Sequence, residues 1–342
     1  MASRAAAAVA VLALVCAVQS SLSAAAVPGL SAAFYKTSCP RLEQIVDKHV
    51  TATFNGDRGV APALMRILFH DCFTQGCDAS VLIKGPGSER ETGPNRTLRP
   101  VALDLIDRIR REANATCGQV VSCADITVLA TRDALVKAGG PRFPVDLGRR
   151  DSFEPATQQV GLLPLPSDDV DGLMRSFRGR NLNRDDLVAL SGAHTFGVAH
   201  CGVISPRVNS ANKTPLMDAQ FAKDLQAKCK TDNPAVTQDL DVLTPHAFDN
   251  KYYEGLNQRK GLFKSDQFLV DHPETRNLAL TFSRDQVAFF KQFAISMTKM
   301  TEMNVLTGKL QGEIRADCSV AGRRPRIAAA AGGGDEGVKA DM

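Results

Sequence analysis

Apolar positions along this chain recur mainly at helical spacing. They lie three or four residues apart in two early segments, at Leu42, Ile45, Val46 and Val50, and again at Leu64, Ile67 and Leu68. Side chains at this spacing share one face of a helix. The pattern therefore predicts two helices that each bury one side.

Polar pairs typical of helix starts precede three further apolar segments. They are Ser122 with Asp125 before a helix over Ile126–Ala138, Asn183 with Asp186 before Leu187–Leu190, and Ser283 with Gln286 before a long helix through Met300. A further helix around Leu225 closes near Cys229. These signals make the chain mainly helical.

Strand signals are few. Alternation predicts a strand over Phe143–Leu147 and a short hairpin within Val305–Ile314, while Gly- and Pro-rich stretches mark loops at Gly85–Pro100 and Gly139–Pro144. The fold class that follows is all-α, with minor short β-strands.

The two ends of the chain differ from the rest in composition. Residues 5–19 are apolar, follow Arg4 and precede a run of Ser and Ala, which is typical of a cleaved secretory signal peptide and too short for a membrane span. Residues 323–342 are rich in Ala and Gly with scattered charges and predict a disordered tail. We therefore expect a signal peptide over 1–26, one domain over 27–322 and a tail over 323–342.

The net charge adds little to the prediction of fold or function. The 342 residues carry a formal net charge of +4, and no basic run alternates with aromatic residues. A nucleic-acid partner is therefore not expected. The chain holds no tryptophan, so no Trp radical site can serve bulky donors.

The number of cysteines, nine in the whole chain, is consistent with a secreted protein. Cys16 leaves with the signal peptide, and an even set of eight in an oxidising compartment predicts disulfides. The sequence alone nearly forces only one pair, Cys72 with Cys77, because the two are so close and flank one loop. The competing interpretation is a zinc site of His70, Cys72 and Cys77, which oxidised sulfurs would exclude.

The block over residues 66–80 carries the strongest chemical signal. Arg66 and His70 lie four residues apart, so both project from one face of a helix and suit chemistry on a small polar molecule. Oxygen-bearing side chains then alternate around the loop closed by the cysteines, from Asp71 before it to Asp78 and Ser80 after it, which is typical of a calcium site. The plainer alternative is a surface arginine beside a packed core histidine.

A second histidine lies in an unusual setting. His194 follows a helix within the small-residue sequence Ala-Leu-Ser-Gly-Ala-His-Thr-Phe-Gly. Small neighbours leave room for a large, flat group to approach the imidazole.

Together these blocks resemble the secreted plant peroxidases, the class III haem peroxidases. The resemblance runs from about Phe34 to Cys318 and is carried by the blocks Arg66–Ser80, Gly148–Ser152, Leu190–Gly197, Asp249–Tyr253 and Ser265–Gln267. One local departure is Arg99-Pro100-Val101, which leaves open where the helix before Ile106 begins.

The resemblance implies a two-lobed, all-α fold with one haem b (heme b) between distal and proximal halves. It makes His194 the axial haem ligand, with its other N–H donated to Asp266. It gives the distal chemistry to Arg66, His70 and Asn95, and the binding of aromatic donors to Pro164. The plainer alternatives are turn roles for Asn95 and Asp266 and an ordinary loop at Pro164.

The resemblance also implies two calcium ions per chain and four disulfides. The first calcium set is Asp71, Thr74, Gly76, Asp78, Ser80 and Glu89, and the second is Thr195, Asp241, Thr244, Ala247 and Asp249. The implied disulfides are Cys39–Cys117, Cys72–Cys77, Cys123–Cys318 and Cys201–Cys229.

The function implied is reduction of hydrogen peroxide to water with one-electron oxidation of phenolic donors. The implied protein is a secreted monomer that lies in the cell wall, or in the vacuole if the tail directs it there. The alternative is an inactive wall protein stabilised by calcium and disulfides. Three sequons begin at Asn95, Asn114 and Asn212. The role implied for Asn95 predicts that it stays bare, whereas Asn212 is modified most fully and Asn114 variably.

Overall fold

The computed structural model describes residues 27–210, 216–230, 233 and 235–322. Its first half contains the helices α2 (Leu42–Gly56), α3 (Val60–Thr74), α4 (Pro100–Cys117) and α5 (Cys123–Lys137). Short 3-10 turns lie between α3 and α4 and after α5: η1 (Ser80–Leu82), η2 (Glu89–Glu91), η3 (Gly93–Asn95) and η4 (Thr157–Leu162).

The second half begins with α6 (Val170–Arg178), α7 (Arg184–Ser191), η5 (Gly192–Thr195), α8 (Cys201–Val208) and α9 (Ala219–Lys228). It continues with α10 (Lys251–Asn257), α11 (Lys264–Asp271), α12 (Pro273–Arg284) and α13 (Gln286–Thr301). The described strands β1 (Val198–His200) and β2 (Thr237–Asp239) form a single antiparallel pair, with Val198 opposite Asp239.

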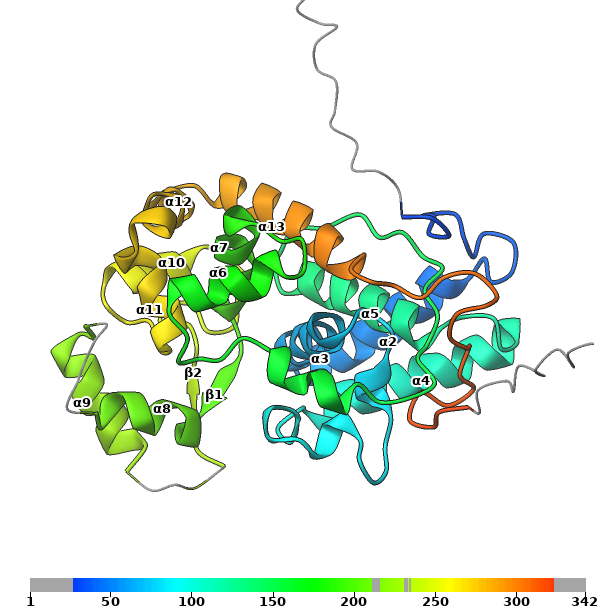
Figure 1. Cartoon of the computed structure of the whole chain (residues 1–342), viewed down its shortest axis with the longest axis horizontal. Helices are drawn as coiled ribbons and strands as arrows, with labels where there is room; N and C mark the ends of the chain where they lie inside the picture. The colour runs from blue at the N-terminus through cyan, green and yellow to red at the C-terminus, as the bar shows by residue number, and fades with distance from the viewer. Residues whose placement is uncertain (1–26, 211–215, 231–232, 234, 323–342) are drawn as a thin grey trace, which may run out of the picture.

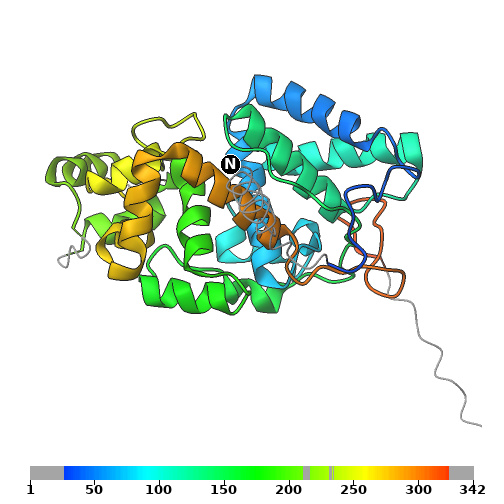
Figure 2. The same cartoon turned by 90° about the horizontal axis from the view of Figure 1, so that it is seen from above.

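The helices gather into two lobes, as expected. Helices α2–α5 lie together on one side and α6–α12 on the other (Figure 1). Helix α13 packs on α7 in the second lobe and also contacts α3 in the first, and the view from above shows it running between the lobes (Figure 2). The all-α, two-lobed expectation is confirmed.

Helix α5 forms the centre of the first lobe. Its residues from Cys123 to Leu135 are all buried, and it packs against α2, α3 and α4. Its start is fixed by Asp125, whose carboxylate accepts hydrogen bonds from the Tyr35 hydroxyl (2.8 Å), the Gly148 N–H (2.7 Å) and Arg149 Nη1 (2.9 Å). Ser122 caps α5 as expected, because its side chain accepts from the Asp125 N–H. The Asp125 carboxylate is occupied by the three partners above and does not accept from the Ser122 N–H, so the reciprocal half of the capping box is missing.

The other helix-start predictions had different outcomes. Asn183 and Asp186 form the reciprocal capping box that the sequence predicts for α7. Ser283 does not start α13, because it lies inside α12 and Asp285 caps α13 by accepting from the Ala288 N–H (2.9 Å). The prediction of a start at Ser283 was therefore wrong by two residues.

The strand predictions were largely wrong. Within Phe143–Leu147 only Leu147 pairs, in an isolated bridge with Ser31, and the predicted hairpin within Val305–Ile314 is replaced by a bridge between Glu313 and Asp151. These segments are tied to distant parts of the chain rather than to their neighbours. Helix α4 begins directly at Pro100, which settles the start that the sequence left open.

Within the described ranges, the structure contains no helix with the length and apolar character needed to cross a membrane. The expected signal peptide, the tail and the Asn212 sequon lie outside the described residues.

Candidate active site

Helix α3 presents Arg66 and His70 one turn apart on the same face. The His70 side chain is buried, with Nδ1 2.5 Å from Oδ1 of Asn95 in η3. The Asn95 Nδ2 donates to the backbone carbonyl of Glu89 at 2.9 Å. A carbonyl can only accept, so this contact fixes the orientation of the amide and turns Oδ1 towards His70. His70 therefore carries its proton on Nδ1, and its Nε2 has a free lone pair.

Burial and the neighbouring Arg66 charge lower the pKa of His70 to about 4. Desolvation and a like charge both disfavour the protonated imidazole. His70 is thus neutral at neutral pH and able to accept a proton on Nε2.

Arg66 is held by the loop that carries Asn95. Its Nη2 donates to the Pro94 carbonyl at 2.6 Å, and its Nη1 donates to the Thr97 carbonyl (3.1 Å) and hydroxyl (3.0 Å). The short segment 94–97 thereby positions both the histidine and the arginine of α3. Sequence reasoning missed Pro94 and Thr97, although both flank Asn95 in the same loop.

The second histidine lies in η5 and is paired with a buried carboxylate. His194 Nδ1 lies 2.7 Å from Oδ1 of Asp266, at the start of α11. The same oxygen accepts from the Tyr252 hydroxyl at 2.9 Å, and Oδ2 accepts from the Phe263 N–H at 2.9 Å. Although burial alone would raise the pKa of Asp266, the His194 imidazole and these donors hold it below its ordinary value. Asp266 is therefore ionised and fully hydrogen-bonded.

Tyr252 and the Phe263 N–H were missed from the sequence. Tyr252 follows directly on the second proposed calcium loop, within the block Asp249–Tyr253, and that adjacency was the available signal. The Phe263 N–H is a backbone group, so the residue type gives no indication of its role.

The proximal imidazole suits a metal-bound flat group. The side chain of His194 is 37% exposed whereas that of Asp266 is 3% exposed, and within the described ranges no hydrogen bond to Nε2 is found. An imidazole that donates Nδ1–H to a carboxylate and keeps Nε2 open is the usual form of a metal-ligating histidine. Phe263 packs edge-on against its ring at a centroid distance of 5.5 Å. These residues fit a haem on the Nε2 side of His194.

Pro164 belongs to the connection between η4 and α6, and this connection leads from the first lobe to the second (Figure 1). It is half-buried, and its neighbours Leu162 and Leu165 are 50% and 53% exposed. Apolar side chains left in solvent around a proline form a surface suited to an aromatic ring.

The first proposed calcium loop concentrates buried acids. Asp71, Asp78 and Glu89 are each at most 3% exposed, and burial followed by mutual repulsion raises the pKa of Asp71 well above its ordinary value. The Ser80 hydroxyl and Glu89 Oε2 are buried without a hydrogen-bond partner. Three buried acids and two orphaned oxygens fit a bound cation, which would supply the missing partner.

Backbone geometry completes this loop. Thr74 is buried, with its hydroxyl donating to the Asp71 carbonyl at 2.9 Å. Gly76 has φ +147°, and a Cβ there would lie 2.5 Å from the Asn304 carbonyl oxygen. Only glycine fits this position without a shift of the backbone.

The second proposed calcium loop brings two acids and two hydroxyls together. Thr195 Oγ1 lies 3.1 Å from Asp241 Oδ2 and 3.2 Å from Asp249 Oδ1, and Thr244 Oγ1 bridges the same pair at 3.3 and 3.0 Å. Burial, opposed by hydrogen bonds and reinforced by Asp249, raises the pKa of Asp241. The half-buried Ala247 lies in the same turn.

In the described part of the chain, no three His, Cys, Asp or Glu side chains are placed so that they alone could hold a metal ion. A cation in either loop would therefore also need hydroxyl, carbonyl or water oxygens, which is the ligand mixture that calcium prefers.

All four expected disulfides are present. They join Cys39–Cys117, Cys72–Cys77, Cys123–Cys318 and Cys201–Cys229. The alternative zinc site is thereby excluded, because Cys72 and Cys77 are bonded to each other and His70 is paired with Asn95.

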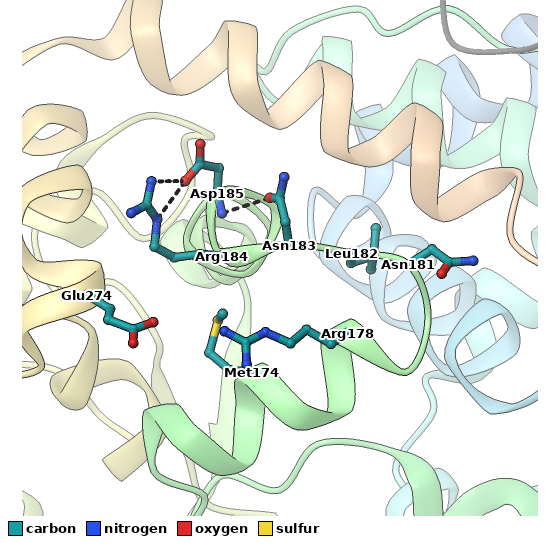
Figure 3. A pocket seen from close by; sticks show the side chains of 8 residues that line it. All are labelled: Met174, Arg178, Asn181, Leu182, Asn183, Arg184, Asp185 and Glu274. Carbon is teal, nitrogen blue, oxygen red and sulfur yellow. Dashed lines mark hydrogen bonds and ion pairs between the residues drawn. The ribbon is translucent and has the colours of Figure 1, made fainter.

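A separate hollow of about 570 Å³ lies on the second lobe (Figure 3). It is lined by Met174, Arg178, Asn181, Leu182, Asn183, Arg184, Asp185 and Glu274. Arg184 turns to its neighbour Asp185, with Nη2 2.7 Å from the carboxylate. None of the residues expected to carry the chemistry lines this hollow, so it lies outside the site.

Comparison with known proteins identifies the family of this chain. The family model described as Peroxidase matches residues 46–285. Peroxidase 12 of Arabidopsis thaliana is 48% identical over 298 residues, which cover 86% of this chain and 83% of that protein. Cationic peroxidase SPC4 of Sorghum bicolor is 48% identical over 299 residues, covering 85% and 82%, and Peroxidase 2 of Oryza sativa subsp. indica is 42% identical over 310 residues, covering 88% and 95%. This chain belongs to the class III haem peroxidases of plants.

Proposed function

We propose that this enzyme reduces hydrogen peroxide at a haem b bound by His194 and uses His70, Arg66 and Asn95 for the distal chemistry. The observation that carries the assignment is the matched pair of imidazoles. Each has Nδ1 engaged by a side-chain oxygen, from Asn95 in one lobe and Asp266 in the other, so that Nε2 is available. Membership of the family itself implies haem.

A haem held by His194 would supply a redox-active iron at which the two-electron reduction of peroxide can take place. His70 Nε2 accepts a proton from hydrogen peroxide and returns it to the departing oxygen, which then leaves as water. A neutral base is needed for the first transfer, and the low pKa of His70 supplies it. Asn95 keeps the imidazole in the required tautomer.

Arg66 stabilises negative charge on the departing oxygen as the O–O bond breaks. Support comes from its anchoring, since three hydrogen bonds to the 94–97 loop hold its guanidinium in place before peroxide arrives. A charge that is already oriented needs no reorganisation during the reaction.

Asp266 makes His194 a stronger electron donor to a bound metal. A carboxylate that accepts the Nδ1 proton increases the basicity of the imidazole and fixes its ring orientation. The Tyr252 hydroxyl and the Phe263 N–H keep Asp266 in the geometry that this requires.

Small aromatic and phenolic donors are proposed to bind at the exposed apolar surface of Leu162, Pro164 and Leu165. Each donor gives up one electron and one proton, and two donors complete a turnover.

Two calcium ions are proposed, one in each loop. The first loop would hold Ca²⁺ with Asp71, Asp78 and Ser80, the carbonyls of Thr74 and Gly76, and Glu89, the last through water. The second would use Asp241 and Asp249, the Thr195 and Thr244 oxygens and the Ala247 carbonyl. Orphaned oxygens in the first loop and the shared acid pair in the second support the two sites.

Four disulfides agree with an oxidising, extracellular compartment. The remaining proposals are a signal peptide over 1–26, an enzyme domain over 27–322, a tail over 323–342, N-glycosylation and a monomeric state. A vacuolar address in the tail is a proposal of the same kind.

The test uses protein secreted from the full chain. We expect one haem per chain with a Soret band, and guaiacol oxidation that depends on hydrogen peroxide. The variant His70→Ala should keep the Soret band and lose most turnover. Wild-type protein that folds but shows neither haem nor turnover would instead favour the inactive, structural alternative.

A further inference from the structure

Arg207 on α8 is a buried arginine behind the proximal site. It is 8% exposed, and its Nη1 donates to the carbonyls of Gly261 and Phe263, both at 2.5 Å. Its Nε and Nη2 are buried and have no hydrogen-bond partner among the described residues. A buried cation with two free donors is costly unless nearby negative charge compensates it.

That compensation comes through space from carboxylates. Burial lowers the pKa of Arg207 to about 10, while Asp266 and Asp271 act against this effect. Both carboxylates make their ion pairs elsewhere, Asp266 with His194 and Asp271 with Arg259. Arg207 therefore remains cationic at neutral pH. It forms no ion pair among the described residues, and its charge acts on Asp266, the partner of His194.

Phe263 connects Arg207 to the proximal pair by three separate contacts. Its carbonyl accepts from Arg207, its N–H donates to Asp266, and its ring packs edge-on against His194. Because one residue makes all three contacts, the arginine that holds the Phe263 carbonyl also helps to position the N–H that donates to Asp266.

The helix that carries Arg207 is itself well anchored. Helix α8 is joined to the end of α9 by Cys201–Cys229, and Ile204 and Val208 belong to a small core that includes Leu262. Arg207 and the 261–263 segment are thus parts of one packed unit, which favours the hydrogen bonds between the guanidinium and this loop.

We propose that Arg207 is a positioning residue of the proximal site. It holds the Gly261–Phe263 segment, and its positive charge, bound to the residue whose N–H donates to Asp266, weakens electron donation from His194. The inference rests on the proposed function, in which His194 binds the haem iron. A positive charge near a metal ligand favours the reduced metal, so Arg207 raises the iron reduction potential that Asp266 lowers.

The chain offers a matched control in Arg110 on α4. Arg110 is 1% exposed, its Nη1 donates to the Val121 carbonyl, and its Nε and Nη2 are also buried without a partner. It lies in the first lobe, and its charged neighbours are Asp151 and Arg315 rather than Asp266. Loss of either arginine removes a buried cation, but only Arg207 lies near the proximal pair.

The test compares haem-loaded full-length wild type with Arg207→Gln, Arg207→Lys and Arg110→Gln. Redox titration gives the iron(III)/iron(II) potential, resonance Raman spectra of the reduced proteins give the iron–imidazole stretch, and thermal melts give stability. We expect Arg207→Gln to lower the reduction equilibrium constant about tenfold, or about 59 mV for a one-electron couple, and to raise the stretching frequency. Arg207→Lys should shift both in the same direction by less, and Arg110→Gln should lower the melting temperature alone.

Two results would overturn the inference. One is a wild-type potential in both Arg207 variants, or in Arg207→Lys if the glutamine variant does not retain haem. The other is a shift in Arg110→Gln as large as that in Arg207→Gln. A wild-type protein without haem or without an iron–imidazole band would refute the proposed function instead, so the two failures are distinguishable.

Discussion

Replacing Asn95 with alanine should damage both stability and peroxide chemistry. The side chain is 2% exposed and makes two hydrogen bonds, to His70 Nδ1 and to the Glu89 carbonyl. Asn95→Ala leaves the His70 Nδ1–H buried and unpaired, at a cost of about 1–3 kcal/mol. The Glu89 carbonyl loses one donor but still accepts from the Thr92 N–H and hydroxyl, so this loss costs about 0.5–1.5 kcal/mol. The expected loss is therefore about 1.5–4.5 kcal/mol, a large fraction of the ~5–15 kcal/mol by which most domains are stable.

The effect on rate has a different origin. Without the amide, nothing fixes the His70 proton on Nδ1, and Nε2 is no longer always available as a base. We expect the reaction with hydrogen peroxide to slow by part of the about 10²–10⁴-fold that general acid–base catalysis contributes. Stopped-flow absorbance of the haem measures this step, and urea denaturation measures the stability.

Asn95→Asp gives a readout that a purely structural role would not produce. A carboxylate beside His70 favours the protonated imidazole and raises its pKa from the wild-type value of about 4. The rate should then fall at a higher pH than in wild type as the solution is acidified, because the base is lost by protonation.

Asn114→Ala is the matched control. Asn114 is also in a sequon, is half-buried, and donates one hydrogen bond to the Ala316 carbonyl at 2.9 Å. Its loss should cost about 1 kcal/mol and leave the peroxide reaction unchanged. If folded, haem-loaded Asn95→Ala reacts with peroxide as fast as Asn114→Ala, the proposed role of the amide is refuted.

Three further outcomes are expected. His70→Ala should retain haem but react with peroxide about 10²–10⁴-fold more slowly, and wild-type rates in stopped-flow measurements would remove His70 from the mechanism. Chelation of calcium should lower the melting temperature and the activity, since a ligand at a hundredfold excess over its Kd stabilises the fold by about 2.7 kcal/mol. If elemental analysis shows that the protein is calcium-free and its melting temperature and activity are unchanged, the two proposed sites are contradicted. Glycopeptide mapping of active enzyme should find Asn95 bare, Asn114 variably modified and Asn212 modified most fully, and substantial occupancy at Asn95 would place that residue on the surface.

The expectation for Asn95 follows from the whole sequon rather than from one side chain. Asn95 Nδ2, the atom that would carry the glycan, faces the Glu89 carbonyl, and the Thr97 hydroxyl is occupied by Arg66. In the folded loop, the first and the last residue of the sequon are thus both engaged in hydrogen bonds. A glycan there would have to displace contacts of Asn95 and Arg66, two of the proposed catalytic residues.

Local spacing predicted the parts of the site that lie on one element. Arg66 and His70 share a helix face, and Cys72 and Cys77 close one short loop, so their proximity follows from distance along the chain. The capping box at Asn183 was predictable for the same reason.

Contacts between distant segments could not be derived in this way. His194 and Asp266 are 72 residues apart, and their pairing came from family resemblance rather than from spacing. The Phe263 N–H and the Glu89 carbonyl are backbone groups that no residue type reveals. The wrong hairpin within Val305–Ile314 has the same cause, because Glu313 pairs with Asp151 across the fold.

The distal and proximal halves of the site have the same arrangement of hydrogen bonds and differ in the side chain that accepts from the histidine. Each histidine presents Nδ1 to a side-chain oxygen and adjoins a proposed calcium loop in sequence, at Asp71 and at Thr195. On the distal side the acceptor is a neutral amide, which orients His70 without adding charge, so burial can keep the pKa of the imidazole near 4 and leave a neutral base. On the proximal side the acceptor is the ionised Asp266, which strengthens the imidazole as a ligand. Exchanging amide and carboxylate would therefore exchange these properties. A carboxylate at 95 would favour the protonated form of His70 and so remove the neutral base, and an amide at 266 would weaken His194 as a ligand.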